Sequence, residues 1–218
     1  MKGPLFYSKI LLFGEYGIIE DSKGLSIPYN FFNGALKISE SSDEEAKKSN
    51  LILSQFSTHL KTLDIDLDLN SFDNHIKKGM YFDSSIPKGY GVGSSGALVA
   101  AVYEKYANNK ITVLENLTRE KLLLLKEIFS KMESFFHGKS SGLDPLNSYL
   151  SIPILIKSKN DINVTGIPSQ KSNGSGAVFL LDSGQTGSTA PMVNIFMEKM
   201  KKEGFRNMLN SQFIKHTN

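Results

Sequence analysis

Apolar residues occupy most positions of the chain from Leu5 to Ile19. Large apolar side chains fall on both sides of this stretch, a pattern that predicts a β-strand buried on both faces. Lys9 lies in the middle of it, where a charge among apolar groups needs an anionic partner. A lysine that bends its ammonium toward solvent from a strand end is the alternative interpretation. The pattern therefore predicts one early buried strand with a single lysine inside it.

Two later segments also carry β patterns. Residues 24–39 contain Asn33-Gly34, the strongest two-residue hairpin signal, and we expect two strands that turn there. Residues 64–73 alternate aspartate with isoleucine or leucine, a period of two that predicts a half-buried strand with an acidic face. These aspartates lack the glycine and the terminal glutamate of a calcium loop, so we interpret the acidic face as solvated.

Helical signals begin near Ser42, Ser94, Thr118 and Met192. Ser42 and Glu45 form a capping box that opens a helix running to about Leu60. Thr118 can cap the third helix, in which apolar residues recur at intervals of three and four and predict one buried stripe. The stripe consists of Leu122, Leu125, Phe129, Met132 and Phe136. The expected core residues of the first helix are Leu51, Leu53 and Phe56.

The composition excludes several classes of function. The 218 residues allow one or two small domains, and a net charge of +3 is too weak to indicate a nucleic-acid partner. The chain has no cysteine, which excludes a disulfide framework and a thiolate metal site and fits a cytoplasmic location. No apolar run approaches the length of a membrane span, and the first residues lack a signal-peptide cleavage pattern, so we expect no membrane partner.

The main chemical signal is a glycine-rich stretch over residues 86–96. Gly89, Gly91 and Gly93 alternate with other residues, and Ser94-Ser95-Gly96 then lead into a helical run. Alternating glycines let the backbone adopt positive φ and approach a ligand closely. Successive amide N–H groups and the start of the following helix together attract anions. This stretch therefore predicts a phosphate-binding loop.

Other phosphate-binding motifs fit the stretch less well. No Gly-Lys-Ser/Thr closes a Walker A loop. Residues 91–96 do spell the G-x-G-x-x-G of dinucleotide-binding proteins, and residues 111–115 could be a strand that ends on an acid. However, the polar, proline-containing residues 83–88 precede the glycines, where a buried strand is required. A dinucleotide-dependent oxidoreductase remains a less favoured hypothesis.

A second chemical stretch covers residues 133–145. Glu133 and His137 are four residues apart and so share one helix face, and Gly138 is expected to end the helix. Asp144 precedes a proline, which favours an extended conformation for it. A carboxylate held in such a loop suits contact with a hydroxyl group. Taken alone, the stretch fits a helix cap followed by an Asx turn slightly better.

Together these segments resemble the galactokinase, homoserine kinase, mevalonate kinase and phosphomevalonate kinase (GHMP) superfamily. Residues 87–97 resemble its ATP-phosphate loop, and residues 133–144 resemble the mevalonate kinase pattern of Glu, His-Gly and Ser-Gly-x-Asp. Residues 9–16 are similar to the first mevalonate kinase motif, although Tyr16 replaces its histidine. Residues 180–189 resemble a fourth family segment, with a glycine where a basic residue is common.

The resemblance implies an α+β fold. It implies a ribosomal-protein-S5-domain-2-like, ATP-binding N-terminal domain over residues 1–172, with a mixed sheet and packed helices, followed by a partial ferredoxin-like domain over residues 173–218. The third glycine-rich motif of the superfamily is not found in the sequence. We therefore expect either a fragment or a shortened member of the superfamily.

The resemblance also implies roles for individual residues. Asp144 would accept the proton of the substrate hydroxyl, with Lys9 beside it to favour the alkoxide. Ser95 and Glu133 would hold Mg²⁺, and Glu15 and Thr189 would lie near the substrate. The ATP phosphates would be held by Gly89, Gly91, Gly93, Ser94, Ser95 and Gly96. His137 is expected to be structural.

The implied activity is ATP-dependent phosphorylation of mevalonate, a step in the synthesis of isoprenoid precursors. The alternatives are a kinase acting on phosphomevalonate, homoserine or a sugar, and a nucleotide-binding protein without turnover. The expected partners are ATP and a small hydroxy acid, and a homodimer is compatible with the resemblance. All of this depends on one spatial prediction, namely that Lys9 and Asp144 meet near the helix that starts at Ser94.

Overall fold

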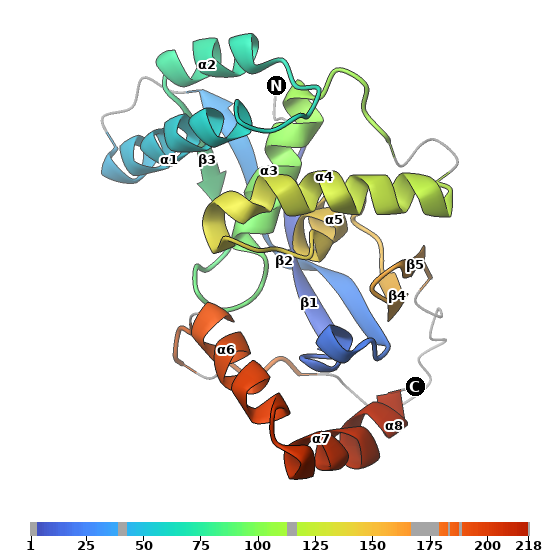
Figure 1. Ribbon diagram of the computed structural model, residues 1–218. Helices are drawn as coiled ribbons and strands as arrows, with labels where there is room; N and C mark the ends of the chain where they lie inside the picture. The colour runs from blue at the N-terminus through green and yellow to red at the C-terminus, as the bar shows by residue number, and fades with distance from the viewer. Residues whose placement is uncertain are drawn as a thin grey trace, which may run out of the picture.

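The structure is a computed structural model that describes residues 4–38, 43–112, 117–166, 179–182, 184–187 and 189–217, with only the backbone of Thr189 and Ala190. Helices and one sheet form the body of the molecule (Figure 1). The strands are β1 Phe6–Phe13, β2 Gly24–Ile38, β3 Met80–Ser84, β4 Ile154–Ser158 and β5 Asp161–Val164. The helices are η1 Gly17–Glu20, α1 Glu44–Leu60, α2 Leu69–Lys77, α3 Ser94–Tyr106, α4 Arg119–His137, α5 Leu143–Leu150, α6 Thr189–Met200, α7 Glu203–Leu209, η2 Asn210–Ile214 and α8 Lys215–Thr217. The expected α+β class is confirmed.

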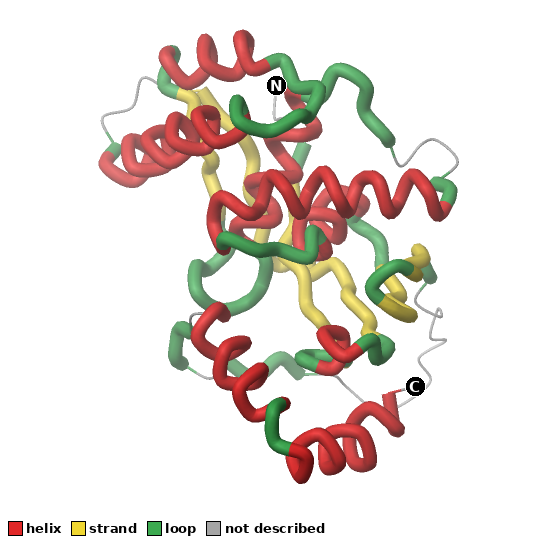
Figure 2. Tube along the Cα trace, viewed as in Figure 1, coloured by secondary structure: helices red, strands yellow, loops and turns green. Residues whose placement is uncertain are grey.

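The sheet is built around the long strand β2. Its described pairings follow the order β1-β2-β4-β5, and β3 also pairs with β2. Each of these pairings is antiparallel, so the prediction of a mixed sheet is wrong. In the view of Figure 2 the upper part of the sheet lies behind α4, while its lower strands extend below this helix.

The hairpin predicted at Asn33-Gly34 is also wrong, because both residues lie inside β2. Gly34 pairs with Phe6 on one side and with Ser84 on the other. A Cβ atom on Gly34 would lie 2.3 Å from Cζ of Phe82, so the glycine makes room for this aromatic ring. The glycine therefore reflects close packing within the sheet, and not a turn.

The aspartate-rich segment forms a loop and the start of a helix in place of the predicted strand. The Asp68 carboxylate accepts a hydrogen bond from the Ser71 amide at 3.0 Å and caps α2. The Asp66 carboxylate accepts hydrogen bonds from Asn108 and Asn109 at 2.7 and 2.8 Å. Asp68 thus binds an N–H group of its own helix start, whereas Asp66 binds side-chain amides 42 and 43 residues away in the sequence.

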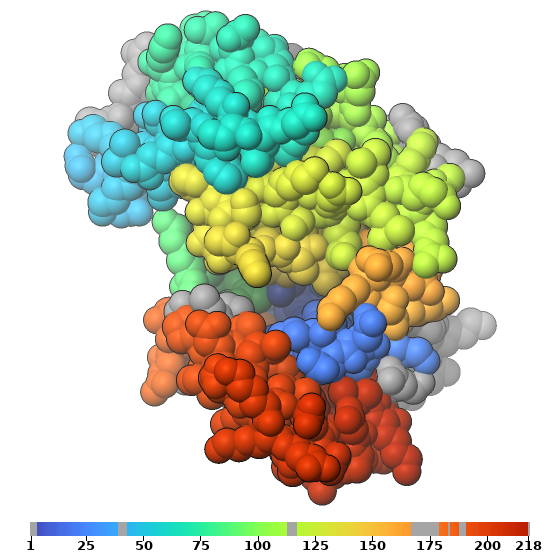
Figure 3. All heavy atoms as spheres, viewed as in Figure 1, coloured from blue at the N-terminus to red at the C-terminus, as the bar shows by residue number. Residues whose placement is uncertain are grey.

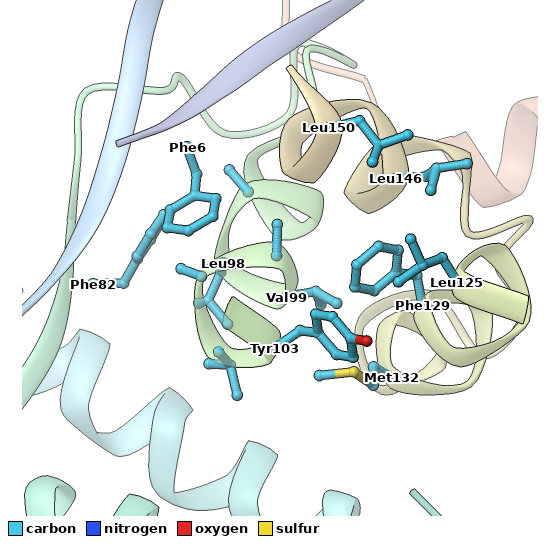
Figure 4. Close-up of a cluster of buried hydrophobic side chains, with 14 of the residues drawn as sticks. Phe6, Phe82, Leu98, Val99, Tyr103, Leu125, Phe129, Met132, Leu146 and Leu150 are labelled. Carbon is cyan, nitrogen blue, oxygen red and sulfur yellow. The ribbon is translucent and has the colours of Figure 1, made fainter. Parts of the chain in front are cut away.

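Helix α3 lies at the centre of the hydrophobic core. Its small residues allow close packing, and α5 crosses directly against it. In Figure 4, Phe6 and Phe82 flank Leu98 on one side of α3, while Leu125 and Phe129 pack on the other side. The predicted stripe of α4 is confirmed at Leu122, Leu125, Phe129 and Met132, all of which are buried.

The ends of several elements differ from their predictions. Strand β1 ends at Phe13, and Leu12 and Phe13 are about half exposed, so only its first part is buried as predicted. Asp43 caps α1 by accepting a hydrogen bond from the Glu45 amide, while Ser42 lies outside the described residues. Leu51 is exposed, whereas Leu53 and Phe56 are fully buried as expected.

The C-terminal helices α6–α8 gather at one end of the molecule, where they form a separate group in Figure 3. Their small hydrophobic cluster contains Phe196, Met200 and Leu209 and packs against Tyr16 and Ile19. The predicted domain boundary near residue 172 lies outside the described residues. Within the described part of the chain, no helix is long and apolar enough to cross a membrane.

Candidate active site

The glycine-rich loop has the backbone conformation that its sequence predicts. Gly89, Gly91 and Gly93 have φ values of 81°, 69° and 83°. A Cβ atom on Gly91 would meet no atom within 4 Å, so this part of the loop faces open space. The Lys9 amide donates a hydrogen bond to the Val92 carbonyl at 3.0 Å and fixes the loop to β1. The loop thus leads from the sheet into the start of α3, where its open face can take an anion.

Lys9 and Asp144 form an ion pair beside the start of α3. Their Nζ and Oδ1 atoms are 3.0 Å apart, so the predicted meeting of these two residues is confirmed. The Lys9 side chain is only 10% exposed and that of Asp144 is 36% exposed, so the open side of the pair is the carboxylate. A Cβ atom on Gly93 would lie 3.1 Å from Cγ of Lys9, which shows how closely the lysine passes the loop.

Asp144 lies in the first turn of α5, and not in an extended segment. Pro145 follows it within the same turn, where a missing amide N–H costs nothing because that group has no partner inside the helix. A Cβ atom on Gly96 would lie 2.7 Å from the Asp144 carbonyl carbon and 2.8 Å from the Pro145 nitrogen. The glycine at this point of α3 therefore brings the Asp144 backbone against the start of α3.

Ser95 and Glu133 form a second polar group at the same helix start. The Ser95 hydroxyl donates to Oε1 of Glu133 at 2.9 Å and also lies 3.0 Å from Nε2 of His137. The Ser140 hydroxyl donates to Oε2 of Glu133. Ser140 in turn accepts a hydrogen bond from the Gly142 amide at 3.0 Å. Each oxygen of the Glu133 carboxylate therefore has a hydroxyl partner.

Glu133 is 3% exposed, and its environment disfavours the negative charge of the carboxylate. Burial and, to a smaller extent, the nearby Asp144 carboxylate raise the pKa of Glu133 to about 7. The hydroxyls of Ser140 and Ser95 and the ammonium of Lys9 act in the opposite direction. An additional positive charge next to Glu133 would therefore stabilise the ionised form of its carboxyl.

The donor atoms at this position fit Mg²⁺. Hydroxyl and carboxylate oxygens are the ligands this ion prefers, and oxygens that share an octahedral site at 2.0–2.1 Å lie about 2.9 Å apart. That is the separation of Ser95 Oγ and Glu133 Oε1. Among the described residues, no group of three or more His, Cys, Asp or Glu could hold a metal ion. A cation here would need further ligands from water and from the phosphates of a nucleotide.

Residues 55–151 match the family model of the GHMP kinases N terminal domain. This segment is a little less than half of the chain, and it is similar to the N-terminal domain of the GHMP kinases. The match includes the glycine-rich loop, Glu133 and Asp144, whereas Lys9 precedes it. No curated protein sequence matches the chain.

Two solved structures share the fold of this chain. One is a mevalonate kinase from L. major in complex with R-mevalonate, which is 20% identical with a TM-score of 0.52. The alignment covers 96% of this chain and 68% of that one. The other is the mevalonate kinase of Methanococcus jannaschii, which is 17% identical with a TM-score of 0.53, and the alignment covers 96% of this chain and 69% of that one. Identities this low establish a common fold and do not identify a substrate.

The two predicted substrate-binding residues, Glu15 and Thr189, lie next to or within the C-terminal helices. Glu15 lines a cavity of about 290 Å³ between the residues just before η1 and the C-terminal helices, and the wall of this cavity is mostly apolar. Tyr16, which stands where the mevalonate kinase motif has histidine, lines the same cavity and stacks on Phe196 with ring centroids 5.0 Å apart. Thr189 begins α6, and its side chain lies outside the described residues.

Two residues of the site were not assigned roles from the sequence. His137 contacts Ser95 although we expected it to be only structural, and its spacing of four from Glu133 was the available signal. Ser140 binds the Glu133 carboxylate, and no pattern distinguishes it from the other serines of its loop. The Ser95–His137 contact joins segments 42 residues apart, whereas Ser140 and Glu133 are only seven residues apart.

Proposed function

We propose that this chain transfers the γ-phosphoryl group of ATP to the hydroxyl of mevalonate. The observation that carries the proposal is the Lys9–Asp144 ion pair, located beside the glycine-rich loop and the start of α3. The GHMP kinase domain supports ATP as the donor. The mevalonate pattern of residues 133–144 supports the acceptor, as do the names of the two solved structures, one of which contains R-mevalonate.

The loop and the start of α3 have the properties needed to bind the nucleotide. The N–H groups of the loop and the partial positive charge at the start of α3 attract phosphate oxygens. We assign this role to Gly89, Gly91, Gly93, Ser94, Ser95 and Gly96. Phosphoryl transfer depends mainly on positioning and charge stabilisation, which a loop fixed to β1 can provide. The proposed ATP-binding domain extends over residues 1–172.

Asp144 and Lys9 act on the acceptor hydroxyl in this proposal. The exposed side of the Asp144 carboxylate accepts the hydroxyl proton while the acceptor oxygen bonds to the γ-phosphorus. The bond between that phosphorus and its bridging oxygen breaks, and ADP leaves with the electron pair. The Lys9 ammonium holds the carboxylate in place and stabilises the negative charge that develops on the acceptor oxygen.

Ser95 and Glu133 are the proposed ligands of Mg²⁺. When bound, the ion would neutralise the charge of the nucleotide phosphates. Glu15 and Thr189 are proposed to contact the acceptor from the side of the C-terminal helices. The assignment of Glu15 is supported by its position in the wall of the cavity.

The test is an assay of ATP consumption by the 218-residue chain with mevalonate, phosphomevalonate, homoserine or galactose. We expect turnover with mevalonate and a loss of kcat of about 10²–10⁴-fold in Asp144→Asn. Lys9→Met should also lose activity by orders of magnitude. Asp83→Asn is the matched control, because it breaks a solvent-exposed ion pair with Lys37. Near-normal turnover by a folded Asp144→Asn variant would overturn the proposal.

The other acceptors separate the remaining alternatives. Turnover with one of them and none with mevalonate would reassign the substrate within the GHMP kinases. Nucleotide binding without turnover on any acceptor would support a binding protein. Each variant is first compared with the original chain by circular dichroism, so that loss of activity is not confused with loss of folding.

A further inference from the structure

The Ser95 hydroxyl has two partners on one face of α4. Oε1 of Glu133 is 2.9 Å from Ser95 Oγ, and Nε2 of His137 is 3.0 Å from it. Glu133 and His137 are four residues apart, so both project from the last turns of α4 toward the start of α3. Ser95 therefore lies between a buried carboxylate and an imidazole.

A serine hydroxyl carries a single proton and can donate to only one of these partners at a time. If Oγ and Oε1 both ligate a cation, each must direct a lone pair toward the ion, and the hydrogen bond between them is lost. The hydroxyl proton then needs another acceptor. An imidazole that carries its own proton on Nδ1 presents Nε2 as that acceptor.

We propose that His137 is a positioning residue, which accepts the Ser95 hydroxyl proton in a hydrogen bond so that Ser95 Oγ can face a divalent cation. This inference rests on the proposed function, because it assumes that Ser95 and Glu133 hold the cation of the nucleotide complex. His137 touches neither the nucleotide nor the ion in this role and acts only through Ser95.

A purely structural role for His137 makes a different prediction. A histidine in the last turn of a helix can stabilise the helix end through the helix dipole. In that role, a substitution of His137 would change the stability of α4, and it would not matter whether the new side chain can accept a hydrogen bond. His137 is largely exposed, so its removal should leave no cavity in the core.

The experiment measures Mn²⁺ binding to the chain by electron paramagnetic resonance in the presence of a non-hydrolysable ATP analogue. Loss of one hydrogen bond corresponds to about a five-fold to ten-fold weaker binding, which we expect for His137→Ala. His137→Gln, whose side-chain oxygen can accept at a position similar to Nε2, should retain most of the affinity. His59→Ala is the matched control, because His59 packs on α4 next to Phe135 and Ser134.

A double-mutant cycle shows whether His137 acts through Ser95. Ser95→Ala should weaken Mn²⁺ binding, and His137→Ala should then have no further effect. Nucleotide binding without metal should be the same in the original chain and in His137→Ala.

Three results would overturn the inference. Equal losses in His137→Ala and His137→Gln would contradict the acceptor role, and additive losses in the cycle would contradict action through Ser95. Unchanged Mn²⁺ binding in His137→Ala, with weakened binding in Ser95→Ala, would remove the role of His137 and leave the proposed function standing. If the original chain does not bind Mn²⁺ together with the nucleotide, the proposed metal site itself fails.

Discussion

The body of the molecule and its C-terminal helices differ in how completely they enclose their apolar side chains. In the body, Phe56 and Phe129 are fully buried within one large cluster. In helices α6–α8 the most buried side chains, Phe196 and Met200 among them, remain 8–9% exposed. Met192 on α6 is about half exposed, although it belongs to the same apolar stripe as these two residues.

The groups assigned to the proposed reaction are divided between these two regions of the molecule. The ion pair, the glycine-rich loop and the Glu133 group all lie on elements that pack against the closed core of the body. The cavity beside Glu15 is formed partly by the C-terminal helices, which meet the body through the Tyr16–Phe196 stack. The groups proposed to transfer phosphate should therefore stay in place even when the C-terminal helices move.

The largest expected effect is the difference between one core substitution in each region. Phe129→Ala should lower the free energy of unfolding by about 3–5 kcal/mol, because its cavity is enclosed on every side. Phe196→Ala should cost about 1–2 kcal/mol, since this ring is already in contact with solvent and its small cluster can collapse. Urea unfolding followed by circular dichroism measures both values. Equal costs would show that the two regions share one cooperative core.

Glycine substitutions give the next largest contrast. A Cβ atom on Gly142 would lie 2.1 Å from the Lys126 carbonyl oxygen, so Gly142→Ala should cost about 3 kcal/mol or more. Gly138 has nearly the same positive φ but meets no atom within 4 Å, and Gly138→Ala should cost only about 1 kcal/mol. Gly204 lies in α7, and a Cβ atom on it would meet no atom within 4 Å. Gly204→Ala should therefore raise the free energy of unfolding by up to about 0.5 kcal/mol.

Thermal unfolding checks these three glycine variants. The matched pair is Gly142 and Gly138, which have nearly the same positive φ, with ψ values of 4° and −46°, and which differ in the space around them. If both alanine variants lose the same stability, conformation and not crowding explains the cost at Gly142.

The sequence predicted best those elements that local signals determine. Thr118 and the apolar stripe after it define α4 without help from distant residues, and Gly138 follows its last residue as expected. The glycine-rich loop was also predicted from local sequence, because alternating glycines are needed wherever positive φ recurs. The meeting of Lys9 and Asp144 came from the family resemblance, since no local pattern relates residues so far apart.

The errors occurred where tertiary contacts determine a residue's role. Gly34 carries a turn signal, but its position is fixed by the Phe82 ring that packs across it. The aspartates of residues 64–68 alternate like a strand, yet their carboxylates bind amide groups of α2 and of the segment after α3. Periodicity cannot show which donors the fold will bring within reach of a side chain.

The contact between Tyr16 and Phe196 gives the third prediction. Its loss in Tyr16→Ala should weaken the attachment of the C-terminal helices by about 1–1.5 kcal/mol. Hydrogen exchange should then become faster in α6 and α7 and remain unchanged in α3. Tyr16→Phe, which keeps the aromatic ring, is the control and should exchange like the original chain. Faster exchange throughout the molecule would mean that the two regions open together.

The smallest expected effect compares two ion pairs with the same separation of 2.6 Å. In the body, Asp73 accepts from the Lys61 ammonium and also from the Ser57 hydroxyl, and these hydrogen bonds lower the pKa of its carboxyl below the ordinary value of 3.8. In α6, Glu198 pairs with Lys201, and both side chains are about 70% exposed.

Because Asp73 is ionised more easily in the folded state, its contribution to stability is full above pH 3.8 and is lost as the pH falls further. Asp73→Asn should therefore lower the free energy of unfolding by about 0.5–1 kcal/mol at pH 7, and the effect should become progressively smaller below pH 3.8. Glu198→Gln should change the free energy of unfolding by less than about 0.5 kcal/mol. Urea unfolding at a series of pH values makes the comparison. A pH-independent loss in Asp73→Asn would attribute its effect to packing and not to charge.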